Sequence, residues 1–122
     1  MPTIREVMSS HLVTVDPETT VAQAATVMAE KRIGSALVME EGSLAGIFTE
    51  RDIVRALSQD FDAPSHPISH WMTRDPKTIG PEETAQVALD RMLQGGFRHL
   101  PVLEGGEVIG VVSLRDLAAG SD

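Results

Sequence analysis

An internal duplication constrains the fold of this 122-residue chain more than any other feature. Shifted by 64 residues, so that Met8 falls on Met72, the two halves align without a gap, and 13 of the 46 positions from Met8 to Ile53 are identical. One copy alone would expose a face of its small sheet and would be marginal in water, whereas two copies can cover each other. The duplication predicts one body with pseudo-two-fold symmetry and clefts at the seam between the copies. The identical residues of the first copy are Met8, Thr14, Pro17, Glu18, Thr20, Ala24, Met28, Val38, Glu40, Gly42, Gly46, Arg51 and Asp52.

The duplication also sets the expected domain organisation. Residues 1–58 form the first repeat and residues 67–122 form the second, and both belong to one compact module. Residues 59–66 between them are rich in polar residues and proline, a composition that is typical of a linker.

Each copy has the same predicted order of elements, β-α-β-β-α, and Thr3 with Glu6 predicts a capping box for a short helix that opens the first copy. Apolar residues at helical spacing predict the first helix of each copy, and two short apolar runs around a glycine turn predict a hairpin. The fold class is therefore α+β, with the two repeats packed through their small sheets. The expected elements are helices at 4–8, from about residue 20, at 50–57 and at 114–119, and strands at 12–15, 36–39, 44–48, 100–103 and 108–112.

Composition and charge exclude several classes of function. The net charge of -8 argues against nucleic-acid binding, because phosphate affinity depends on clustered lysine and arginine. The absence of cysteine excludes disulfides and thiol chemistry, and no apolar run is long enough to span a membrane. The N-terminal residues lack the apolar stretch of a signal peptide, so we expect a cytoplasmic protein. The Met1 start and the short Gly120-Ser121-Asp122 end favour a complete, small, stand-alone chain.

One motif recurs at the end of the last strand of each copy. Thr49 stands three positions before Asp52, and Ser113 stands three positions before Asp116. Such a pair caps the N-terminus of a helix, and capping alone is the simplest explanation of a single occurrence.

The recurrence of the motif, with an arginine inside it each time, favours a ligand site. A helix N-terminus attracts anions such as phosphate. The hydroxyl of Thr49 or Ser113 can donate to a phosphate, and Arg51 or Arg115 can add a charge-assisted contact. The aspartate can accept hydrogen bonds from the two hydroxyls of a ribose, as in dinucleotide-binding folds.

From Val7 to Leu117 the sequence resembles a tandem cystathionine-β-synthase (CBS) domain pair of the small stand-alone type. The resemblance rests on the order and spacing of several short motifs that are each unspecific. It implies a module that binds adenosine-containing ligands. The motifs are Val7-Met8, Trp71-Met72, Arg98-His99-Leu100-Pro101-Val102 and the two Gly-x-x-Ser/Thr-x-x-Asp segments that begin at Gly46 and Gly110.

The resemblance assigns roles to individual residues. It implies that Asp52 and Asp116 bind ribose hydroxyls and that Thr49 and Ser113 bind phosphate. The adenine pocket would be lined, mostly by backbone, by Thr14, Val15, Asp16, Ile33, Ser35, Ala36, Thr78, Ile79, Gly80, Phe97 and Leu100.

The two copies differ where the middle strand begins. The second copy has Arg98 and His99 there, whereas the first has Gly34 and Ser35. In similar proteins basic residues at this place contact phosphates, so we add Arg98 and His99 to the phosphate-binding candidates. The missing basic pair in the first copy predicts one good ligand site and not two equal ones.

The sequence contains one apparent metal site and one apparent catalytic site, and the neighbouring residues argue against both. His66 and His70 have helical spacing, but Pro67 lies between them and no third ligand is close in sequence, which argues against zinc. An aspartate three residues after Ser113 caps the same helix and does not orient a distant histidine such as His99, which argues against a hydrolase triad. We predict no catalytic residue, no metal and no cofactor.

The sequence therefore predicts a regulatory binding module for AMP, ADP, ATP, S-adenosylmethionine or NAD that signals by a change of conformation. The resemblance also implies a homodimer that meets through its helices and an unknown regulated partner protein. Trp71 and the exposed apolar positions of the closing helices are candidates for the dimer surface, with a place in the core as the alternative for Trp71. The alternatives are an interaction module of the same fold without a ligand, an accessory part of an enzyme, and a nucleic-acid binder if the basic residues gather on one face.

Overall fold

The computed structural model describes residues 2–120, which fold into two compact units. The first-repeat unit comprises Leu12–Pro76, and the second-repeat unit joins the segment up to His11 to the segment from Lys77 onward. The spatial units therefore do not follow the sequence repeats, because residues 2–11, at the start of the first repeat, pack with the second.

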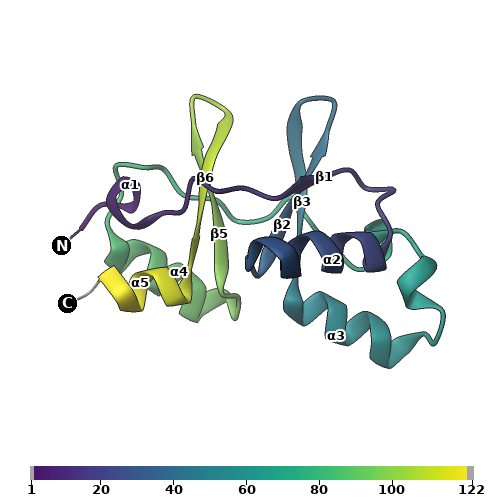
Figure 1. The fold of residues 1–122 in the computed structure, drawn as a ribbon. Helices are drawn as coiled ribbons and strands as arrows, with labels where there is room; N and C mark the ends of the chain where they lie inside the picture. Colours follow the sequence, from purple (N-terminus) through teal and green to yellow (C-terminus); the bar gives the residue numbers. More distant parts are fainter. Residues whose placement is uncertain (1, 121–122) are drawn as a thin grey trace. The chain divides into compact units, whose positions relative to one another are not determined.

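Four strands in the order β1-β2-β3-β4 form the sheet of the first-repeat unit. Figure 1 labels the first three of them. β1 runs parallel to β2, β2 and β3 form the expected antiparallel hairpin, and β4 pairs antiparallel with the outer edge of β3. The strand expected over 12–15 is shorter in the structure, although the Leu37 N–H still donates to the Val13 carbonyl at 2.8 Å. The strands are β1 (Thr14–Val15), β2 (Ser35–Glu40), β3 (Ser43–Thr49) and β4 (Thr73–Arg74).

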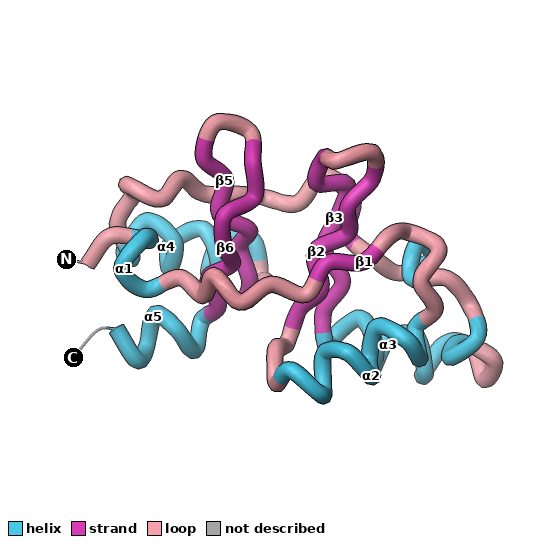
Figure 2. Tube along the Cα trace, turned by 45° about the horizontal axis from the view of Figure 1, so that its top comes forward, coloured by secondary structure: helices cyan, strands magenta, loops and turns pink. Residues whose placement is uncertain are grey.

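Two helices, α2 (Val21–Lys31) and α3 (Glu50–Gln59), lie side by side and complete this unit (Figures 1 and 2). The apolar stripe that predicts α2 is buried, with Val21, Ala24 and Met28 all in the core. The unit therefore has the β-α-β-β-α order and the α+β class that the sequence predicts.

The segment expected to be a linker is packed against this unit. Residues Ala63–Ser65 form a 3-10 helix that contacts both α2 and α3, and Ala63 is completely buried. A second 3-10 helix, Ile68–His70, leads into Trp71, which is also buried. Although residues 59–66 are mostly polar, Ala63 among them is buried in the core of this unit.

The second-repeat unit has the same architecture with shorter outer pairings. Isolated bridges join Ile79 to Val102 in parallel and Ser9 to Val111 in antiparallel fashion, which matches the positions of β1 and β4 in the other unit. Its elements are α1 (Ile4–Val7), α4 (Ala85–Gly95), β5 (His99–Glu104), β6 (Glu107–Ser113) and α5 (Leu114–Gly120).

The N-terminal segment is an integral part of the second-repeat unit. Ile4 is fully buried in its core, and Ser9 exchanges two backbone hydrogen bonds of 2.9 Å with Val111. Arg5 donates side-chain hydrogen bonds to Glu82 and Glu104, and these bonds raise the pKa of its guanidinium. The expected capping box of α1 is confirmed, since the backbone N–H of Thr3 donates to the Glu6 carboxylate at 3.0 Å.

Two glycines at equivalent positions allow the outer segments to approach each sheet. A Cβ on Gly46 would lie 2.7 Å from the Thr73 carbonyl oxygen, and one on Gly110 would lie 2.9 Å from the Ser9 carbonyl oxygen. Both distances are shorter than real Cβ contacts, so only glycine fits without a shift of the neighbouring backbone.

We predict that Gly110→Ala lowers the free energy of unfolding by about 1–3 kcal/mol, because the new methyl group collides with the N-terminal segment. Urea denaturation measures this change. Gly80→Ala is the matched control, since its added Cβ would lie 3.6 Å from the Glu83 carboxylate, an ordinary contact distance. Equal stabilities of Gly110→Ala and Gly80→Ala would contradict the close approach.

Candidate functional site

A reciprocal pair of hydrogen bonds closes the motif of the first-repeat unit. The backbone N–H of Thr49, which ends β3, donates to Oδ2 of Asp52 at 2.9 Å. The backbone N–H of Asp52 donates back to the Thr49 hydroxyl oxygen at 3.4 Å, and that hydroxyl lies 3.2 Å from Oδ2. The capping prediction for α3 is thereby confirmed.

The second-repeat unit has the same arrangement. The backbone N–H of Ser113 donates to Oδ2 of Asp116 at 2.8 Å, and the backbone N–H of Asp116 donates to the Ser113 hydroxyl oxygen at 3.1 Å. In both units the cap uses Oδ2 of the carboxylate, so Oδ1 lies outside it.

The start of the middle strand meets this cap in each unit. Ser35 is the register partner of Thr49, and the Glu50 N–H donates to the Gly34 carbonyl at 3.1 Å. The structure thus brings together the hydroxyl residue, the aspartate and the β2 start that the sequence singled out separately.

The second-repeat unit makes the equivalent contacts. His99 is the register partner of Ser113, and the Leu114 N–H donates to the Arg98 carbonyl at 2.9 Å. Arg98 and His99, the predicted phosphate contacts, therefore lie next to the cap of Asp116.

The candidate adenine-pocket segments lie one strand further along each sheet. Thr14 and Val15 pair with β2 on the edge that faces away from β3, and the Ile79 N–H donates to the Pro101 carbonyl at 3.0 Å beside β5. Asp16 and the segment Thr78–Gly80 continue these edges, so the middle strand separates them from the caps.

Burial divides the candidate residues into two groups. Ala36, Leu100 and Ile79 are core residues, so their side chains stabilise the units and only their backbone can face a ligand. Ile33 and Phe97 are half-buried and pack against the two cores. Ser113, Asp116 and His99 are half-buried, whereas Arg51, Arg98 and Arg115 are exposed.

The two polar candidates of the first-repeat unit that are fully buried are Ser35 and Asp52. Asp52 is satisfied by its cap, but the Ser35 hydroxyl has no hydrogen-bond partner among the residues that the structure describes. An unpaired buried hydroxyl is costly, so this group is a candidate for contact with a ligand.

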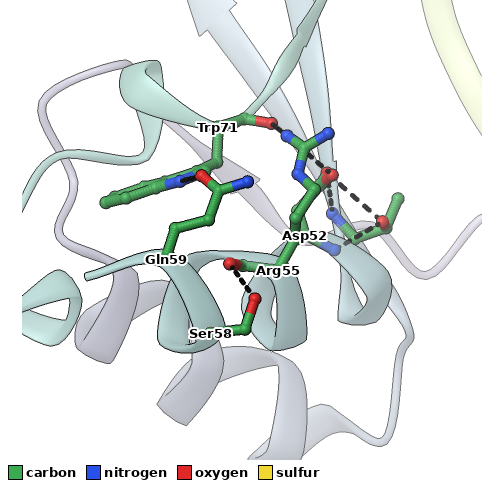
Figure 3. A network of polar contacts seen from close by, with 6 residues as sticks. Asp52, Arg55, Ser58, Gln59 and Trp71 are labelled. Atoms are coloured by element: carbon green, nitrogen blue, oxygen red, sulfur yellow. Dashed lines mark hydrogen bonds and ion pairs between the residues drawn. The ribbon is translucent and has the colours of Figure 1, made fainter. Parts of the chain in front are cut away.

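Asp52 also belongs to a polar network that the sequence did not predict (Figure 3). A terminal nitrogen of Arg55 lies 3.6 Å from Oδ1 of Asp52 and donates to the Trp71 carbonyl at 2.7 Å. The Trp71 indole donates to the Gln59 side chain at 3.0 Å. The sequence contained one clue, because Ala119 occupies the place of Arg55 in the second copy.

The structure decides between the two sequence-based alternatives for Trp71, a dimer surface and the core. Its side chain belongs to the first-repeat core and is only 7% exposed, and its indole N–H is paired within the unit. A buried residue with a satisfied polar group has little to offer a partner, so Trp71 is a core residue.

Neither a metal-binding cluster nor a membrane-spanning helix is found among the described residues. Within residues 2–120, no three His, Cys, Asp or Glu side chains are grouped so as to hold a metal ion. His66 and His70 do lie with their ring centroids 5.5 Å apart, next to Trp71. None of the helices in the same range has the length and apolar character that crossing a membrane would require.

The CBS domain family matches this chain twice, over residues 4–59 and 68–120. The chain belongs to the CBS domain family. Both CBS repeats therefore contain one copy of the cap described above, and the resemblance noted in the sequence is confirmed.

Several relatives of this CBS pair are known. An uncharacterized 17.7 kDa protein of Acidianus ambivalens is 40% identical over 118 residues, which are 94% of this chain and 70% of that protein. The chain spans only 21% of the length of two CBS domain-containing proteins of Arabidopsis thaliana.

Solved structures of CBS-domain proteins share the fold. A CBS-domain containing protein from Agrobacterium tumefaciens superposes with a TM-score of 0.93 at 28% identity, covering 98% of this chain and 99% of that one. A CBS domain protein from Pyrobaculum aerophilum complexed with AMP superposes with a TM-score of 0.84 at 28% identity, covering 93% of this chain and 88% of that one.

We predict opposite stability changes for two hydroxyl substitutions in the ligand-free protein. Thr49→Ala removes the hydroxyl that accepts from the Asp52 N–H in the cap of α3, and it lowers the free energy of unfolding by about 1 kcal/mol. Ser35→Ala removes an unpaired buried hydroxyl and leaves the free energy of unfolding unchanged or raises it by roughly 1 kcal/mol. Urea denaturation of both variants tests this, and a destabilised Ser35→Ala would mean that its hydroxyl has a partner after all.

Proposed function

We propose that this CBS pair is a regulatory module that binds an adenosine-containing ligand and catalyses no reaction. The observation that carries the proposal is the duplicated capping carboxylate, which keeps Oδ1 outside the cap at the start of α3 and α5. The AMP complex of the Pyrobaculum aerophilum relative supports the ligand class. AMP, ADP, ATP, S-adenosylmethionine and NAD all contain the ribose that this site would recognise.

Ribose recognition is assigned to Asp52 and Asp116. A carboxylate accepts up to two hydrogen bonds on each oxygen, so Oδ2 can keep its cap while Oδ1 accepts from a ribose hydroxyl. Because the cap fixes the side-chain rotamer, the ligand meets a carboxylate that is already oriented, which lowers the entropic cost of binding.

Phosphate recognition is assigned to the motif hydroxyls and their basic neighbours. Ser113 lies at the N-terminus of α5, with Arg98 and His99 on the neighbouring strand start. Arg115 follows Ser113 by two positions and is exposed, and Thr49 with Arg51 would play the same roles in the first repeat. Charge-assisted hydrogen bonds from arginine suit phosphate oxygens in both strength and geometry.

Regulation would follow from a difference in affinity. A ligand shifts a protein between two conformations only if it binds one of them more tightly. We assign this chain a cytoplasmic role in which ligand binding changes what the module presents to a regulated protein partner.

The alternative is an interaction module of the same fold without a ligand. One observation favours it: the reciprocal caps satisfy Asp52 and Asp116 within the chain itself. The two proposals differ in what happens to stability when an adenosine ligand is added.

We predict that at least one of AMP, ADP, ATP, S-adenosylmethionine and NAD raises the melting temperature. At 100 times its dissociation constant a ligand stabilises the folded state by about 2.7 kcal/mol, which corresponds to several degrees for a domain of this size. Asp116→Ala reduces the ligand-induced shift, because it removes one of the two ribose acceptors, and Asp52→Ala combined with Asp116→Ala abolishes it.

Asp90→Ala is the control for this panel, since Asp90 is an exposed carboxylate on α4 that accepts a hydrogen bond from the Gln86 side chain of its own helix. It should retain the full ligand-induced shift even if its own melting temperature changes. Absence of a shift for every ligand would rule out the binding proposal and favour the interaction module.

We also propose that the protein is a homodimer that meets through helix faces. Val54 and Leu57 of α3 and the nearby Phe61 are large apolar side chains that are 69%, 53% and 97% exposed. Apolar side chains on one exposed face are typical of an interface.

We predict that Leu57→Glu converts the dimer to a monomer, because it places a charge in the apolar contact. Size-exclusion chromatography with light scattering measures the mass of the particle. Leu93→Glu on α4, where Leu93 is 71% exposed, is the control and should leave the mass unchanged. A monomeric wild-type protein would contradict the dimer.

A further inference from the structure

The two CBS repeats differ in the group that lies beside the ribose-binding carboxylate. In the first repeat, Oδ2 of Asp52 is held by the cap, and Oδ1 lies 3.6 Å from a terminal nitrogen of Arg55 (Figure 3). The second repeat has Ala119 at the position that aligns with Arg55, a side chain with no charge to offer Asp116.

The carboxylate of Asp52 also has more polar partners within its own unit than the carboxylate of Asp116 has among the described residues. The Thr49 hydroxyl lies 3.2 Å from Oδ2 of Asp52 and donates to it, which adds a second hydrogen bond on that oxygen. The Asp52 side chain is only 9% exposed, whereas Asp116 as a residue is half-buried. A ligand therefore has to displace more existing interactions to reach Asp52.

Arg55 is held beside Asp52 by contacts outside the motif. The same terminal nitrogen donates to the Trp71 carbonyl at 2.7 Å, and Trp71 is fixed in turn by the core and by its bond to Gln59. The Arg55 side chain is still 50% exposed. These contacts hold Arg55 next to Asp52, and its half-exposed side chain can still move away from Asp52 when a ligand binds.

We propose that Arg55 is a specificity-determining residue that competes with the ribose for Asp52 and makes Asp116 the tighter of the two sites. A ribose hydroxyl that donates to Oδ1 takes the place of the arginine, so binding at Asp52 carries the cost of breaking the ion pair. The inference rests on the proposed function, since it concerns the same carboxylates and the same ligand class.

A purely structural role of Arg55 makes different predictions. If Arg55 only ties α3 to Trp71, its removal lowers stability and leaves the affinity for a ligand unchanged or weaker. If it competes for Asp52, its removal tightens ligand binding at Asp52. Added salt then also tightens ligand binding in the protein that retains Arg55, because salt screens the ion pair.

The experiment measures adenosine binding by calorimetry in an Asp116→Ala background, where Asp52 is the remaining ribose site. Adenosine is the probe because it has the ribose hydroxyls but no charge, so salt acts on the protein pair alone. Arg55→Gln retains a side-chain donor for the Trp71 carbonyl without the positive charge, and Arg55→Ala copies the second repeat. Both should tighten binding roughly two- to fivefold, the range expected for a partly exposed ion pair.

Two controls make the result specific. Gln59→Ala removes the partner of the Trp71 indole without touching the ion pair, and it should leave adenosine affinity unchanged. Arg55→Gln in an Asp52→Ala background should likewise leave binding at Asp116 unchanged.

The possible outcomes separate the two proposals. Tighter binding by both Arg55 variants, with the salt effect lost, supports the competition. Adenosine binding that Arg55→Gln and Arg55→Ala leave unchanged or weaken overturns the role of Arg55 and leaves the proposed function intact. If adenosine binds neither the wild-type protein nor any variant, the ribose assignment fails and the role of Arg55 fails with it.

Discussion

The structure depends on one reciprocal interaction, the exchange of hydrogen bonds between a hydroxyl residue and an aspartate three positions later. In each unit it turns the chain from the last strand into the last helix, from Thr49 to Asp52 and from Ser113 to Asp116. Because the cap satisfies otherwise unpaired backbone N–H groups, the aspartate is held in one orientation. Under the proposed function, the same carboxylate would cap the helix and bind the ligand, so the two interpretations of the motif are compatible.

Duplication gives the module two such carboxylates, and sequence divergence has made their surroundings unequal. The first repeat has Ser35 at the strand start and Arg55 behind Asp52, whereas the second has His99 and an alanine at the matching places. These substitutions change the charge near each carboxylate but leave the backbone arrangement the same, since the two hairpins have the same register. If both carboxylates bind a ligand as proposed, these differences give the two sites different affinities.

The sequence predicted the elements that local pattern determines and missed those that distant contacts determine. The hairpins, the buried stripe of α2 and both caps follow from periodicity and spacing over a few residues, and all are present. The docking of Ile4 on the second-repeat core and the tie from Arg55 to Trp71 join residues far apart in the chain. Such contacts leave no periodic signal, and for the same reason the sequence left open whether Trp71 lies in the core or at a dimer surface.

The most direct test of the account is a crystal structure of this chain with AMP, the ligand found with the Pyrobaculum aerophilum relative. The account predicts ribose hydroxyls within hydrogen-bond distance of Oδ1 of Asp116, the phosphate beside Ser113 and Arg98, and the Ser113 cap still in place. AMP bound away from both aspartates, or no bound AMP at saturating concentration, would contradict the central claim that the capping carboxylates are the ribose acceptors.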